Sequence, residues 1–126
     1  IVIIDHCRDE KELYELYCLR PMPNQYDFEF LMQNPNLFCF YDEKLGFLRG
    51  FITVQTEDID GKKRLTLSGT SIRGNMPDNI DAIIAVCEAF NDDMYAVTPL
   101  RHAELVLRKA GFVKLKEQIL VRYKNG

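Results

Sequence analysis

Several features are missing from this sequence, and each absence argues against a class of function. The four cysteines, Cys7, Cys18, Cys39 and Cys87, form no C-x-x-C pair, which argues against a zinc knuckle. No apolar run approaches the length of a membrane span. The net charge of −3 comes from interspersed residues of both signs, so no clustered basic surface is indicated for nucleic-acid phosphates. The chain also lacks internal repeats, low-complexity tracts and linkers.

The remaining composition is that of an ordinary globular chain. With 126 residues and 47% hydrophobic content, the chain is long enough to bury a core, and we expect one domain over residues 1–126. All four cysteines stand in or beside predicted helices and strands, next to apolar residues, so we expect buried free thiols. Free thiols favour a cytoplasmic protein, although the even cysteine count leaves disulfides open. No metal site and no membrane contact are predicted.

The spacing of apolar residues predicts alternating strands and helices. Strands are expected at residues 1–4, 37–42, 46–57, 64–72, 94–98 and 113–123. Helices are expected at residues 11–20, 27–34, 80–90 and 100–110. Asp60-Gly61 indicates a tight turn, and Gly50 indicates a bulge. The order β-α-(α)-β-β-β-α-β-α-β predicts an α/β (α+β) fold, in which a mixed six-stranded sheet carries helices on both faces.

The last two predicted helices carry specific local signals at their ends. The stretch "RGNMPDN" predicts a loop, after which Asp78 or Asn79 caps the next helix. Gly111 is placed to end the last helix in a left-handed conformation. The strand after Gly111 alternates at its start, which predicts one solvent-exposed face. The apolar stripe of the last helix is predicted to contain Leu100, Ala103, Leu107 and Ala110.

This element order, closed by a helix, Gly111-Phe112 and a strand, resembles the GNAT (Gcn5-related N-acetyltransferase) superfamily. The family often reads Asn-x-x-Ala-x-x-x-Tyr-x-x-x-Gly-Phe at this place, and Ala103, Gly111 and Phe112 match that pattern. Leu107 stands where the family has a tyrosine, often the general acid toward the departing thiolate. The resemblance therefore implies a GNAT-like fold, while Leu107 departs from its chemistry.

The GNAT resemblance also implies a phosphate loop of the form Arg/Gln-x-x-Gly-x-Gly/Ala at a helix start. In this sequence Met76 and Asp78 replace the two small residues, and Pro77 lacks a donor N–H. Asp78 would also bring a negative charge to the place of the coenzyme A pyrophosphate. We therefore expect no cofactor unless the chain is active, in which case the cofactor is acetyl-CoA. The candidate cofactor-binding residues are Arg73, Gly74, Asn75 and Asn79.

A GNAT enzyme would also need a general base to deprotonate an ammonium substrate. The strand "LTLSGTSI" carries no acid and no histidine, which leaves Tyr95, Glu57 and His102 as catalytic candidates. Each has a simpler structural interpretation. Glu57 stands next to a solvated turn, Tyr95 is suited to a core or cleft wall, and His102 is expected to be exposed in the first turns of the last helix.

The chain as a whole, from "IVIIDHCRDEKELYELY" onward, also resembles small head-assembly or virion-associated proteins of short-tailed enteric phages. That resemblance implies protein partners among virion components and a location in the host cytoplasm or the virion, with a homo-oligomer left open. The sequence thus favours a non-catalytic GNAT-like interaction protein in phage head assembly. The alternatives are an active acetyl-CoA-dependent N-acetyltransferase acting on an unknown amine, and a small-molecule or nucleotide-binding module without acyl chemistry.

Overall fold

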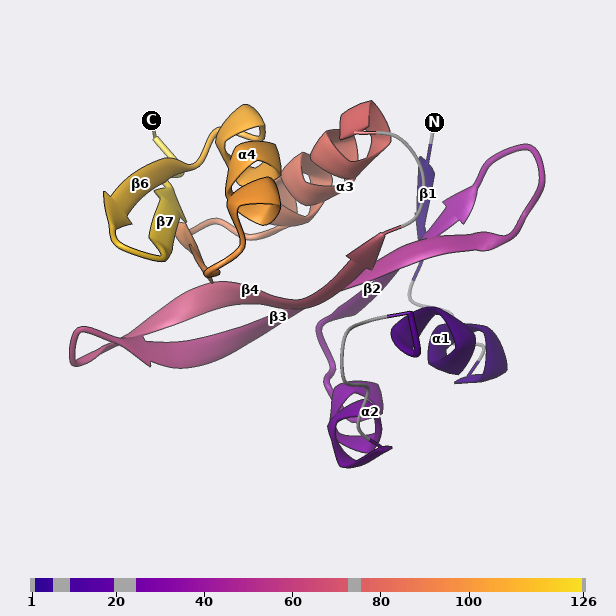
Figure 1. Ribbon diagram of the computed structural model, residues 1–126. Helices are drawn as coiled ribbons and strands as arrows, with labels where there is room; N and C mark the ends of the chain where they lie inside the picture. The colour runs from indigo at the N-terminus through magenta and orange to yellow at the C-terminus, as the bar shows by residue number, and fades with distance from the viewer. Residues whose placement is uncertain (1, 6–9, 20–24, 73–75, 126) are drawn as a thin grey trace.

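A computed structural model describes residues 2–5, 10–19, 25–72 and 76–125 of the chain (Figure 1). Within these ranges the strands form a seven-stranded sheet in the order β1-β2-β3-β4-β5-β7-β6, in which only the β4–β5 pair is parallel. The elements in chain order are β1 (Val2–Asp5), α1 (Glu10–Tyr17), α2 (Gln25–Met32), β2 (Leu37–Asp42), β3 (Leu48–Ile59), β4 (Lys62–Ile72), α3 (Met76–Ala89), β5 (Met94–Val97), α4 (Arg101–Lys109), β6 (Val113–Lys116) and β7 (Ile119–Arg122).

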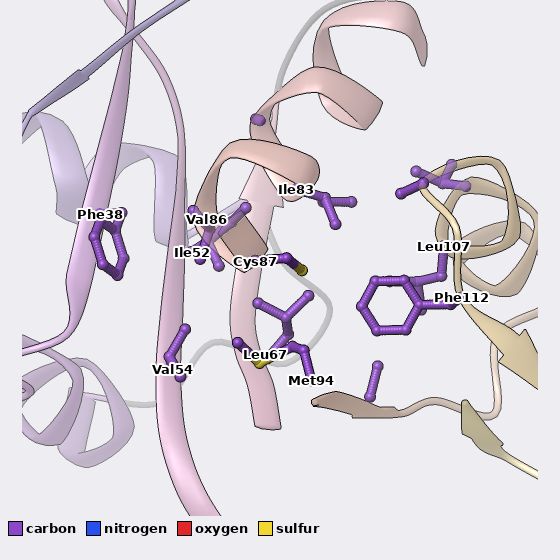
Figure 2. Close-up of a cluster of buried hydrophobic side chains, with 14 of the residues drawn as sticks. Phe38, Ile52, Val54, Leu67, Ile83, Val86, Cys87, Met94, Leu107 and Phe112 are labelled. Carbon is purple, nitrogen blue, oxygen red and sulfur yellow. The ribbon is translucent and has the colours of Figure 1, made fainter. Parts of the chain in front are cut away.

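The helices lie on both faces of the sheet, which confirms the predicted fold class. Helices α3 and α4 cover one face, and α1 and α2 lie against the other (Figure 1). The larger apolar cluster forms beneath α3 and α4 and includes Ile52, Leu67, Met94 and Phe112, whose side chains converge between helices and sheet (Figure 2). The cluster beneath α1 and α2 draws those of its sheet residues whose side chains are described from β2 and β3. This second face is therefore covered by helices over only part of its width.

Two predicted turns are confirmed by backbone geometry. Asp60 and Gly61 both have positive φ, of 53° and 81°, as a two-residue hairpin turn requires. Gly111 has φ 99° at the end of α4. Its N–H donates to the Arg108 carbonyl at 3.1 Å, and the Phe112 N–H donates to the Leu107 carbonyl at 3.0 Å. These two bonds form a Schellman motif, which satisfies carbonyl groups that the helix end would otherwise leave unpaired.

The last part of the chain differs from its prediction in three ways. The single strand expected at residues 113–123 is a hairpin of two strands, β6 and β7, because the chain turns at Gln118 with φ 67°. All four residues of β6 are exposed, so the expectation of one exposed face is wrong. The physical reason is that β6 pairs with β7 at the edge of the sheet. Leu100 is 63% exposed and stands outside the apolar stripe of α4, because it precedes the first helical turn.

Helix α3 begins earlier than predicted, within the segment expected to be a loop. It starts at Met76, so Pro77 lies in its first turn. Proline is tolerated there because the first N–H groups of a helix have no intrahelical partner. Asp78 and Asn79 are consequently helical residues, and the prediction that one of them is the N-cap is wrong.

The cysteine prediction is confirmed for two of the described positions. Cys39 and Cys87 are buried free thiols, and burial raises the pKa of Cys87 to about 11. Cys18 is free but exposed, contrary to expectation, because it follows the last residue of α1. Cys7 lies outside the described residues. Among the helices that the structure describes, none has the length and apolarity needed to cross a membrane.

Candidate active site

Strands β4 and β5 are hydrogen-bonded over a short stretch and then diverge. We call the point after Leu67 and Ala96, where they diverge, the parting, and it is the central feature of the candidate site. The two strands pair only at Thr66 with Tyr95 and at Leu67 with Ala96. Strand β4 then continues to Ile72, still paired with β3 on its other side. The backbone groups of residues 68–72 that face β5 therefore have no strand partner in the described sheet, and they are available to a ligand.

A bulge in β4 lies just beyond the parting. Phe51 pairs with Ser71 and Thr53 pairs with Ser68, so two residues of β4 stand opposite Ile52 alone. A bulge of this kind locally re-aims the backbone and increases the twist of the strand. Beyond Leu67, β4 thus carries irregular backbone on a strand that has no described strand partner on the side of β5. This combination suits recognition of an extended ligand by its amide groups.

The start of α3 is held to the sheet by an arginine that the sequence analysis missed. Arg49 is the extra residue of a second bulge, between β2 and β3, which confirms the irregularity predicted at the neighbouring Gly50. Its Nη1 lies 2.7 Å from the Asp78 carboxylate and 3.5 Å from Asp42. The Arg49 and Asp78 side chains are only 13% and 16% exposed. The negative charge that Asp78 brings to the helix start is therefore compensated by Arg49.

Only part of the predicted phosphate loop can be compared with the structure. Arg73, Gly74 and Asn75 lie outside the described residues. Asn79 is half-buried on α3, and its Oδ1 is a buried acceptor without a hydrogen-bond partner in the described part of the chain. Buried polar atoms are rarely left unpaired, so this amide is a candidate ligand contact.

Leu107 gives the site no acid on α4. Its side chain is 8% exposed and packs in the apolar cluster with Phe112 and Ile83 (Figure 2). Of the residues that match the GNAT ending, Phe112 packs in this cluster, Gly111 and Phe112 form the Schellman turn, and Ala103 is half-buried on α4. None of the residues described in this cluster carries a carboxylate or a hydroxyl group.

A row of polar side chains crosses the opposite face of the sheet at the parting. Gln55, Thr66 and Tyr95 are neighbours across β3, β4 and β5. One step further from the parting, Glu57 pairs with Arg64. Gln55 Nε2 donates to Glu57 Oε1 at 2.6 Å, and the Arg64 guanidinium lies 5.3 Å from the centre of the Tyr95 ring. We call these five residues the polar row.

The polar row lies on the face where α1 and α2 pack. The alternating neighbours Val54, Leu67 and Ala96 point into the cluster beneath α3 and α4, so the row points the other way. Among the residues whose side chains the structure describes, the apolar cluster beneath α1 and α2 takes none from β5 or from residues 62–67 of β4. Gln55, Glu57 and Arg64 of the row are half-buried beside the parting, whereas Thr66 and Tyr95 are buried.

The three predicted catalytic candidates are brought together only in part. Tyr95 is buried within the polar row, and Glu57 is half-buried there. Glu57 pairs with Arg64, three residues before Leu67, which is roughly 10 Å along the strand from the parting. A carboxylate at that distance acts on a reacting amine only through water. His102 is exposed in the first turn of α4 and is not part of the row.

The comparisons with known proteins agree with this geometry. No family model and no curated protein matches the sequence. Solved structures do match. An acetyltransferase of the GNAT family from Bacillus anthracis has TM-score 0.73 at 14% identity and covers 99% of this chain and 96% of its own. An N-acetyltransferase from Staphylococcus aureus Mu50 has TM-score 0.71 at 9% identity, with 100% and 99% covered.

The chain has the GNAT fold. A GNAT acetyltransferase from Brucella melitensis, solved in complex with acetyl-CoA, also shares it, with TM-score 0.64, 14% identity and coverage of 98% of this chain and 88% of its own. At such low identities the likeness concerns the fold alone. It confirms the fold implied by the closing segment, whereas nothing in the comparisons supports the resemblance to phage head-assembly proteins.

Proposed function

We propose that this chain binds acetyl-CoA, or a close acyl-CoA, between β4 and β5 and transfers the acyl group to a primary amine. The observation that carries the proposal is the parting of the two parallel strands after Leu67, with a bulge in the free edge of β4. The Brucella melitensis protein of the same fold was solved with acetyl-CoA, which supports this choice of ligand.

The described residues fit the cofactor in two places. The unpaired backbone of residues 68–72 offers N–H and C=O groups to the amides of an extended pantetheine arm. The N-terminus of α3 offers partial positive charge to a pyrophosphate, and Arg49, which also contacts Asp42, offsets part of the opposing effect of Asp78. Pro77 still lacks one donor, so we expect weaker phosphate binding than a glycine-rich loop would give.

The bound coenzyme would supply an activated thioester, and the residues of this chain would position the amine. Glu57 is the nearest described carboxylate on the polar row, and water would connect it to an amine at the parting. Gln55 orients that carboxylate by donating to Oε1. Because Leu107 cannot donate a proton, the departing thiolate would take its proton from water or from the acceptor ammonium. We therefore expect slow turnover.

A non-catalytic interaction protein is the second candidate, and Leu107 is the observation that favours it. An apolar side chain buried at the place of the general acid is expected if the fold is kept without the reaction. The more specific hypothesis, a role in phage head assembly with virion proteins as partners, remains a prediction.

Release of free thiol from acetyl-CoA distinguishes the two candidates. The protein is incubated with acetyl-CoA and a panel of primary amines, and thiol release and acylated product are measured together. We expect product for at least one amine, at a rate reduced by substitution of Glu57 with glutamine. If the protein binds acetyl-CoA at no accessible concentration and yields no product, the interaction protein becomes the better account.

A further inference from the structure

A small cavity opens at the far end of the polar row, away from the parting of β4 and β5. Its volume is about 220 Å³, and it lies between the β3–β4 hairpin, β5 and β6. It is lined by Ile59, Asp60, Lys62, Arg64, Tyr95 and Leu115. Ile59 and Tyr95 also form a small apolar cluster with Val121, so the cavity has a rigid floor.

The charges around this cavity favour an anion. The carboxylate of Asp60 is paired with Lys116 and contributes little net charge. Glu57 stands opposite Arg64, but its carboxylate accepts from Gln55, and no ion pair joins it to Arg64 within the described residues. With Asp60 paired to Lys116, the cations Lys62 and Arg64 outnumber the one remaining carboxylate, Glu57, so the described residues around the cavity leave one net positive charge.

Arg64 is held in a conformation suited to binding. Its guanidinium lies over the Tyr95 ring, which fixes the side chain without using its N–H donors. In the described part of the chain the Arg64 side chain makes no hydrogen bond or ion pair. A planar guanidinium with free donors matches the two oxygens of a carboxylate, and partial burial strengthens the interaction relative to the protein surface.

The distance from this cavity to the parting limits the size of the ligand. Arg64 precedes Leu67 by three residues, so their Cα atoms are roughly 10 Å apart along β4. The long Arg64 side chain covers part of this separation. A ligand that reaches both places needs a spacer of about two residues of extended chain, roughly 7 Å, between its amine and its anionic group.

We propose that the cavity binds the carboxylate of the acceptor, so that the preferred acceptor is a small molecule with a primary amine at one end and a carboxylate at the other. Arg64 binds the carboxylate, and Lys62 adds a second positive charge beside it. The amine lies toward the parting of β4 and β5. The proposal rests on the acyltransferase function proposed above, but the cavity itself does not depend on the cofactor.

The test compares 6-aminohexanoate with hexylamine, two amines of similar length that differ in the carboxylate. Binding is followed by NMR titration without acetyl-CoA, and KM is measured in its presence. We expect 6-aminohexanoate to bind near Arg64 and to have a KM lower than that of hexylamine by about tenfold, as one charge-assisted hydrogen-bonded pair provides. Arg64→Gln should abolish this preference by raising the KM for 6-aminohexanoate to about that for hexylamine.

The matched control is Lys63→Gln, which removes the same charge from the exposed neighbouring residue on the opposite face of β4 and should leave the preference intact. Equal binding of the two amines, or an unchanged preference in Arg64→Gln, would overturn the proposal even if acetyl-CoA turnover is observed. Binding of 6-aminohexanoate that requires Arg64 would support the cavity even if acetyl-CoA fails to bind. The results therefore distinguish a failure of the proposed carboxylate site from a failure of the proposed acyltransferase function.

Discussion

The two faces of the sheet differ in how completely helices cover them. Beneath α3 and α4 the apolar cluster extends from β2 to β7, and none of its described residues is charged or carries a hydroxyl or amide group (Figure 2). On the other face, α1 and α2 cover β2 and β3, while β4 and β5 carry the polar row. The covered face packs β4 and β5 together through Leu67, Met94 and Ala96, and the other face carries the polar groups proposed to meet an acceptor.

This difference implies that substitutions on the two faces have different consequences. Changes in the covered cluster should lower stability, and changes at the half-buried Gln55, Glu57 and Arg64 of the polar row should alter acceptor preference at little cost in stability. Arg49 is the exception, because it is a polar residue that ties the sheet to the start of α3.

The largest effect is expected for Phe112→Ala in the covered cluster. Phe112 is 2% exposed, and its loss should lower the free energy of unfolding by about 3–5 kcal/mol. Denaturant unfolding measures the change. Phe30→Ala is the matched control, because Phe30 is 69% exposed and its loss should change stability by less than about 0.5 kcal/mol. Similar losses in both variants would contradict the assignment of the core.

The next effect in size is expected for Arg49→Ala, which removes the guanidinium that lies 2.7 Å from the Asp78 carboxylate. We expect a loss of about 1–3 kcal/mol, because a largely buried charge loses its compensation. Acetyl-CoA affinity should fall as well, since the negative charge then opposes the pyrophosphate. Adding Asp78→Asn should restore part of both losses.

Arg108→Ala is the control for Arg49→Ala, because it removes an exposed pair with Glu104 worth about 0.3–0.5 kcal/mol. Thermal unfolding and calorimetric titration measure both quantities. If Asp78→Asn restores neither the stability nor the acetyl-CoA affinity of Arg49→Ala, the hypothesis that Arg49 compensates the charge of Asp78 at the start of α3 is wrong.

A smaller gain is expected from a hydroxyl at the place of the missing acid. Leu107→Tyr should raise kcat by about tenfold or more over Leu107→Phe if thiolate protonation limits turnover, since general acids typically contribute 10²–10⁴-fold. Both variants should lose about 1–3 kcal/mol of stability by overpacking, so their ratio isolates the hydroxyl. Equal rates for the two variants would show that protonation at this place is not limiting.

The smallest effect concerns pH and the β2–β3 turn. The backbone N–H groups of Leu45 and Lys44 and the Arg49 guanidinium lower the pKa of Asp42 from its ordinary value of 3.8. The stabilisation is therefore complete above that value and is lost as the pH falls through the lower folded pKa. Asp42→Asn should be less stable than the natural chain at neutral pH, and the difference in Tm should shrink at pH below 3.8. A difference in Tm that persists unchanged at pH below 3.8 would exclude the lowered pKa of Asp42 as its cause.

Much of the fold could be predicted because local signals fixed it. The Asp60-Gly61 turn and the Gly111 helix end depend on backbone conformations that few residue types adopt. The break between β6 and β7 was missed, since Gln118 is not a typical turn residue and the apolar pattern continues on both sides of it. The start of α3 was missed because Pro77 was interpreted as a loop residue.

The candidate site could be predicted less well, because most of it depends on pairing between strands. The two-residue turn at Asp60-Gly61 fixes the register of the hairpin, so the Glu57–Arg64 pair could have been found by counting from it. The residue at which β4 and β5 part has no local signal, since it depends on how far β5 continues beside β4. The Arg49–Asp78 contact joins segments far apart in the sequence, and no local pattern indicates it.

The most direct test of the central claim is a titration of the isotope-labelled protein with acetyl-CoA, followed by NMR of its backbone amides. The account predicts saturable binding, with the largest shifts in β4 after Leu67 and at the start of α3. Shifts in β6, or none at millimolar acetyl-CoA, would contradict the proposal that the parting of β4 and β5 is a coenzyme site.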